Sequence, residues 1–195
     1  MTKITYNNRV VDLILRGGEQ DVRAAFVAEA KRQLQDGIRE AGPDGYLQYV
    51  DGVKGAQLDA VKPKGGVILF EFYYTKQIAQ RALEILNPTS PKDTGRYIES
   101  HSVFANNARV ENLDAIDTAR SVIITNTVPY ARIIEKGMGK HVPWSRQEQV
   151  PAEGVYAAAT KKLKREFGQI ADIASTWVSF EGGTGRSPAI AITRR

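Results

Sequence analysis

The stretch SPKDTGRY, residues 90–97, decides how the middle of this chain folds. Pro91 restricts its own φ to about −65°, Asp93 can accept hydrogen bonds from backbone amides ahead of it, and Gly95 can adopt a positive φ without steric cost. We therefore predict a sharp structural turn made by Pro91, Asp93, Thr94 and Gly95. This turn redirects the chain from a preceding helix into the central sheet.

The residues before the turn predict two helices and one strand. Residues 19–40 carry apolar side chains every three or four positions, which is typical of an amphipathic helix, and a second such run spans residues 75–86. Residues 67–74, VILFEFYY, are β-branched or aromatic and predict a strand. The intervening residues 43–66 are rich in glycine, proline and charge, and we predict a loop or insertion there.

The residues after the turn predict two strands and a long helix. Residues 96–105 and 120–127 suit strands, and apolar residues recur at helical spacing over residues 152–177. The expected fold class is therefore α+β, with helices packed on an antiparallel sheet. We expect residues 1–180 to form a single domain with extended loops.

The last stretch, EGGTGRSPAIAITRR at residues 181–195, predicts a C-terminal arm. Its glycine-rich beginning cannot pack a core, and the alternation that includes Ile190 and Ile192 suits a strand lying on a neighbouring subunit. Arg186, Arg194 and Arg195 would then meet acidic or phosphate groups. The alternative is that AIAIT adds an edge strand to the chain's own sheet.

Composition excludes several classes of protein. The 195 residues contain no cysteine, so disulfide frameworks, thiolate zinc sites and thiol nucleophiles are excluded. The 27 Lys and Arg residues exceed the 22 Asp and Glu residues and leave a formal charge of +5, which attracts polyanions weakly. No apolar run is long enough to span a bilayer, and the N-terminus lacks the apolar stretch of a signal peptide. We expect synthesis in the cytoplasm and no membrane partner.

The motifs that could carry chemistry each favour a simpler explanation. GGTGRS, residues 182–187, lacks the spacing of a phosphate-binding loop and is expected to be a linker. His101 and His141 are the only histidines and do not have metal-ligand spacing, so we expect them at the surface or in turns. We predict no catalytic residue, no metal site and no cofactor, and we expect that the protein is not an enzyme.

The run KKLKRE, residues 161–166, allows two interpretations. On a helix, Lys161 and Arg165 point away from the face that carries Leu163, which favours an ordinary solvated face. The alternative is a nucleic-acid contact, because clustered basic residues attract phosphates.

Two short motifs in a fixed order resemble a known family. PKDTGRY at residues 91–97 is followed by TNTVPYARIIEKG at residues 125–137 and then by a helix that opens with small residues. This order resembles the tail-completion or head-tail joining proteins of tailed bacteriophages over roughly residues 75–170. The family's usual pattern lacks the strand at residues 67–74 and the loop before it.

The resemblance implies a structural virion protein at the phage neck. Such a protein is an α+β protomer that assembles in the host cytoplasm into a closed ring, commonly a hexamer or dodecamer. Its partners would be copies of itself, the connector or adaptor, the tail proteins, and DNA that passes through the channel without sequence specificity.

A closed ring needs two different surfaces on each protomer, and aromatic and arginine side chains in loops are suited to them. The residues that we assign to the subunit interface are Tyr97, Tyr130, Arg132, Glu135, Gly137 and Trp144. An alternative for Tyr130 is a core aromatic at a strand end. Two other functions stay open: a non-enzymatic nucleic-acid-binding module, and an enzyme of a type that the motifs do not identify.

Overall fold

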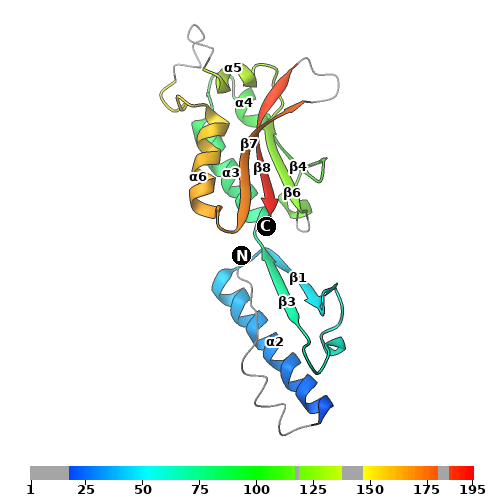
Figure 1. Cartoon of the computed structure of the whole chain (residues 1–195). Coiled ribbons are helices and arrows are strands. Elements are labelled where there is room, and N and C mark those ends of the chain that lie inside the picture. The colour runs from blue at the N-terminus through cyan, green and yellow to red at the C-terminus, as the bar shows by residue number, and fades with distance from the viewer. Residues whose placement is uncertain (1–17, 117–118, 138–146, 180–184) are drawn as a thin grey trace. The chain divides into compact units, whose positions relative to one another are not determined.

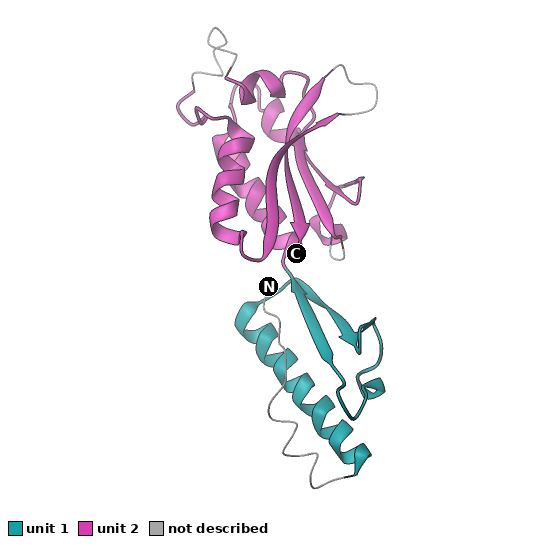
Figure 2. Ribbon diagram, viewed as in Figure 1, with its two compact units in different colours: residues 1–73 teal, residues 74–195 magenta. Residues whose placement is uncertain are grey.

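Two antiparallel sheets, of three and five strands, organise the protein together with its helices (Figure 1). The computed structural model describes residues 18–116, 119–137, 147–179 and 185–195. The α+β class expected from the sequence is confirmed. The chain forms two compact units, residues 1–73 (unit 1) and residues 74–195 (unit 2), with a boundary that the sequence analysis did not place (Figure 2).

Unit 1 combines one long helix with a small sheet. Its described elements are α2 (Glu19–Ala41), β1 (Gly45–Val50), β2 (Val53–Lys54), the 3-10 turn η1 (Leu58–Ala60) and β3 (Ile68–Tyr73). The strand order is β2-β1-β3. The buried apolar side chains that join these elements include Val50, Val61, Phe70 and Phe72. The predicted helix over residues 19–40 and the predicted strand VILFEFYY are both confirmed.

The prediction of a loop over residues 43–66 is wrong for much of its length, because β1, β2 and η1 lie there. A two-residue hairpin turn at Asp51 and Gly52 joins β1 to β2, and both residues have positive φ, 51° and 83°. Asp-Gly is the preferred pair for such a turn, since it matches the twist of the flanking strands. This signal was present in the sequence.

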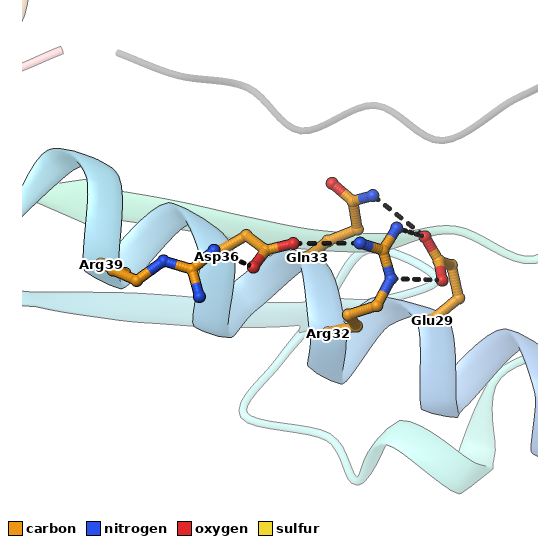
Figure 3. Close-up of polar contacts among 5 residues, drawn as sticks. All are labelled: Glu29, Arg32, Gln33, Asp36 and Arg39. Carbon is orange, nitrogen blue, oxygen red and sulfur yellow. Dashed lines mark hydrogen bonds and ion pairs between the residues drawn. The ribbon is translucent and has the colours of Figure 1, made fainter.

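The solvated face of α2 carries a ladder of charged side chains (Figure 3). Arg32 pairs with Glu29 one turn before it and with Asp36 one turn after it, at 3.0 Å for the second pair. Asp36 also accepts from Arg39 at 2.7 Å, and Gln33 donates to Glu29 at 3.0 Å. Pairs at this spacing stabilise a helix by roughly 0.2–0.5 kcal/mol each.

Unit 2 packs its helices on one face of the five-stranded sheet (Figure 1). The helical elements are α3 (Thr75–Thr89), α4 (Arg96–Glu99), η2 (Leu113–Ile116), α5 (Ala131–Glu135) and α6 (Val155–Phe167). The strands are β4 (His101–Ala105), β5 (Ala108–Val110), β6 (Ser121–Asn126), β7 (Ala171–Ser179) and β8 (Arg186–Arg194). They run in the order β5-β4-β6-β8-β7, with every neighbour antiparallel.

Three predictions for this unit meet different outcomes. The strand expected over residues 120–127 is confirmed as β6. The strand expected over residues 96–105 begins with one helical turn, α4, before β4. The helix expected over residues 152–177 is wrong in its second half, because α6 ends at Phe167 and β7 follows. The segment ADIASTWVS contains apolar residues that fit either period, and its β-branched content favours the strand.

The prediction of a C-terminal arm is also wrong. β8 lies between β6 and β7 and pairs with both, so it is neither an arm nor an edge strand. Ile190 and Ile192 are fully buried in the core of unit 2, because the alternating residues place both isoleucines on the face that the helices cover.

The arginines of this segment bind within the same protomer or lie at its surface. Arg186 is exposed at the start of β8. Arg194 Nε donates to the hydroxyl of Thr75 at 3.4 Å, and Arg195 Nε pairs with Asp172 at 2.7 Å.

Candidate functional site

The turn after α3 has the conformation that its sequence predicts. Gly95 has a φ of 80° and immediately precedes α4, so the expected positive φ is confirmed. The amide of Arg96 donates to the hydroxyl of Thr94 at 3.4 Å, so threonine, rather than Asp93, holds the turn. Pro91 is buried beneath the turn, whereas Asp93 and Thr94 are exposed.

Asn126 joins this turn to the second motif. It is the last residue of β6 and is fully buried. Its amide nitrogen donates to the carbonyl of Tyr97 at 2.7 Å, and its amide oxygen accepts from the backbone of Val128 at 3.1 Å. Asn126 belongs to the second motif, and its role does not follow from the sequence alone because its partner Tyr97 lies in the first motif.

The two motifs together line a cavity of about 240 Å³, which we name the junction pocket. Its lining residues come from the turn, from α4 and from the second motif: Pro91, Asp93, Thr94, Gly95, Arg96, Tyr97, Tyr130 and Ile134. The tyrosine rings of Tyr97 and Tyr130 lie with centroids 6.5 Å apart. All four residues predicted to form the structural turn therefore meet Tyr130 in one place.

Tyr97 is a core residue, so its assignment to an exposed subunit interface is wrong. Only 3% of it is exposed, and within the described part of the chain its hydroxyl has no hydrogen-bond partner. Burial raises the pKa of this hydroxyl well above its usual value, and nearby Glu135 and Tyr130 raise it further. Tyr97 therefore stays neutral and acts through packing.

Glu135 is also internal, and its assignment to the interface is wrong for a different reason. Its two carboxylate oxygens accept from the backbone amides of Tyr156 and Ala157, at 2.9 and 2.8 Å. These amides belong to the first turn of α6, where backbone donors have no partner within the helix. Burial raises the pKa of Glu135, and the amide bonds oppose that shift only in part.

Gly154 makes this arrangement possible. It has a φ of 104°, and a Cβ built on it would lie 2.6 Å from the Cδ of Glu135. Only glycine combines this φ with so close an approach. The acid and the glycine before α6 thus form one capping unit.

A buried chain of polar side chains lies beside the capping unit. Ser90 donates from its hydroxyl to the carbonyl of Leu86 at 2.6 Å and lies 2.9 Å from Nε2 of His101. Nε2 therefore carries the proton and donates to Ser90, and Nδ1 accepts from the hydroxyl of Tyr156 at 2.7 Å. The prediction of a surface or turn position for His101 is wrong, and burial lowers its pKa to about 4.

The remaining residues assigned to the interface differ in exposure. Tyr130 is half-buried and packs against the core while lining the junction pocket. Arg132 is exposed on α5, and Gly137 is exposed just after it with a φ of 60°. Trp144 lies outside the described residues, as does His141.

The basic run of α6 is a solvated face. Leu163 is fully buried, whereas its neighbours Lys161, Lys162, Lys164 and Arg165 are exposed, as the preferred interpretation predicted. A groove of about 570 Å³ lies where α6 ends and β7 begins. We name it the α6–β7 groove.

The chemistry of these places is that of binding and packing. Ser90, His101 and Tyr156 are not among the residues that line the junction pocket. Among the described residues, no group of three acidic or histidine side chains could hold a metal ion. The described helices include none that is long and apolar enough to cross a membrane. No protein-family model, curated protein or solved structure matches the chain.

Proposed function

We propose that the protein is a structural component of the neck of a tailed bacteriophage. In this role, copies of the chain form a ring that joins the DNA-filled head and its connector to the tail. The observation that supports the proposal is the meeting of the two resembling motifs: Asn126 of the second donates to Tyr97 of the first, and both line or support one pocket. Motifs that act as one structural unit are a stronger resemblance than two isolated strings.

The rim of the junction pocket and the outer side of α5 form the proposed subunit interface. Arg132 is exposed there, and Tyr130 presents a half-buried ring beside it. Asp93 and Arg96 add an exposed acid and an exposed base at the pocket. A charge-mixed rim around an aromatic side chain is typical of protein interfaces.

Negative-stain imaging of the purified full-length protein with tail-less heads of its phage tests the proposal. We expect protein density to bind at the connector. The variant Arg132→Glu should reduce this binding, whereas Arg120→Glu, the same charge change at an exposed residue outside the proposed interface, should not. Heads that bind none of the wild-type protein would contradict the proposal.

A non-enzymatic nucleic-acid-binding module is the second candidate. The observation that favours it is the exposed basic face of α6 beside the α6–β7 groove. An enzyme is less well supported, because the hydrogen-bonded side chains Ser90, His101 and Tyr156 do not line the junction pocket.

A further inference from the structure

We propose that the α6–β7 groove binds the phosphate backbone of duplex nucleic acid, without sequence specificity. The inference deepens the second candidate function and rests on it. The lining of the groove includes small side chains of the two C-terminal strands, among them Ala174 and Ala191. The lining also includes residues from the last turn of α6, from the turn after it and from the chain end at and beyond β8.

The charges that line the groove are predominantly positive. Lys164 and Arg165 line it from α6, and Arg195 lines it from the residue that follows β8. Asp172, the one acid among the described residues of the lining, pairs with Arg195 at 2.7 Å. Cations from elements that are distant in sequence therefore converge on one hollow.

The two cations of α6 are available for a ligand. Within the described part of the chain, neither Lys164 nor Arg165 forms an ion pair, whereas the acid next to them, Glu166, is held by Arg81 at 2.9 Å. Cations in the last turn of a helix also complement its dipole. The helix dipole explains why positive residues stand at this end of α6, but it does not pair them, so the charges of Lys164 and Arg165 stay exposed to solvent.

The lining chemistry favours a phosphodiester backbone over an acidic protein. Gln169 and Thr193 add hydrogen-bond donors beside the three cations, which suits phosphate oxygens. Most of the apolar side chains in the lining are alanines, with Ile173 the larger exception, and alanine offers little area to the large anchor residues that dominate protein interfaces. Among the described residues, no aromatic ring lines the groove for bases to stack on, which favours a duplex over a single strand.

Fluorescence anisotropy with a labelled DNA duplex of mixed sequence tests this site in the full-length protein. Lys164 and Arg165 form no ion pair among the described residues, and two phosphates that they neutralise predict a slope of log K against log salt of about −1.8. The variant Lys164→Gln/Arg165→Gln should reduce the slope to near zero and weaken binding roughly 60-fold at about 0.1 M salt. Arg195→Gln should change the slope by less than about one, because Asp172 already pairs with Arg195.

The matched control is Lys62→Gln/Lys64→Gln, which removes the same charge from exposed lysines of unit 1. It should bind the duplex as the wild type does. Equal weakening in both double variants would show that net charge acts rather than the groove, and would overturn the proposal. So would absent binding, a single strand that binds more tightly than the duplex, or poly-glutamate that binds as tightly as DNA.

The same variants separate this inference from the neck proposal. Lys164→Gln/Arg165→Gln should leave binding to phage heads unchanged, whereas Arg132→Glu should leave the DNA slope unchanged. A wild-type protein that binds phage heads but not duplex DNA would overturn this inference alone. A wild-type protein that binds duplex DNA but not phage heads would overturn the neck proposal alone.

Discussion

At the end of unit 2 where the two motifs meet, two ionisable side chains have their partners inside the protomer, whereas at the end where α6 passes into β7 two basic side chains are exposed. Glu135 and His101 find their partners inside the protomer, on backbone amides and hydroxyl groups. Lys164 and Arg165 face solvent. Glu135 and His101 therefore stabilise the fold of unit 2, whereas Lys164 and Arg165 are available to bind a partner. The sequence alone does not distinguish these two roles, because all four side chains are polar.

The largest expected effect comes from the core strand between the two ends. Ile192→Asp places an unpaired charge at a position that is 1% exposed, and should lower the free energy of unfolding by about 4 kcal/mol or more. Ala174→Asp puts the same charge on the exposed side of β7 and should change it by less than about 1 kcal/mol. Urea unfolding of both variants measures the difference. Similar stability of Ile192→Asp and Ala174→Asp would contradict the position of β8 in the core and would support the C-terminal arm.

Removing the carboxylate of Glu135 should lower the free energy of unfolding nearly as much as Ile192→Asp does. Glu135→Ala leaves the amides of Tyr156 and Ala157 without their acceptor, and an unsatisfied buried donor costs about 1–3 kcal/mol. We expect a loss of about 3 kcal/mol in urea unfolding. Glu84→Ala, an exposed acid on α3, is the control and should lose less than about 0.5 kcal/mol. An unchanged midpoint for Glu135→Ala would show that the capping unit does not stabilise α6.

Acid should destabilise the protein through His101. The unfolded chain binds a proton below pH 6.5, whereas the buried imidazole binds one only below about pH 4. Stability should therefore fall between these values by about 1.4 kcal/mol per pH unit, about 3 kcal/mol in total. The raised pKa of Glu135 acts in the opposite direction near the acid end.

His101→Gln isolates the histidine contribution. The difference in unfolding free energy between the wild type and this variant should shrink steadily as the pH is lowered from 6.5 toward 4. A difference that is independent of pH would mean that His101 is not held neutral by burial.

A smaller effect is expected at the turn. Gly95→Val forces a β-branched residue to a φ of 80° and should cost about 1–2 kcal/mol. Gly95→Asn should cost less, since asparagine tolerates this conformation. Thermal unfolding distinguishes the two variants. Equal melting temperatures would imply that the turn relaxes without strain.

The sequence predicted correctly those features whose conformation depends on a few consecutive residues. The turn at Gly95, helix α2 and strand β3 each follow from a few consecutive residues, and all three predictions are confirmed. The Asp-Gly turn at residues 51–52 was equally local and could have been predicted.

The other errors arise where a residue's role depends on distant parts of the chain. Glu135 was assigned to the subunit interface because it belongs to the second resembling motif, and nothing near it in the sequence indicates that it accepts hydrogen bonds from the amides of α6. β8 was expected to leave the body because its glycine-rich beginning suggested a linker, yet its isoleucines complete the core. Six of the eight residues that line the junction pocket were named from the sequence, all but Arg96 and Ile134, and the burial of Tyr97 was misjudged.

The mass of the full-length protein in solution, measured by light scattering, tests the neck proposal most directly. The account predicts a single species of six or twelve subunits, as the family resemblance implies. Arg132→Glu should lower that mass, and Lys164→Gln/Arg165→Gln should not. A wild-type protein with the mass of one chain at every concentration measured would contradict the ring.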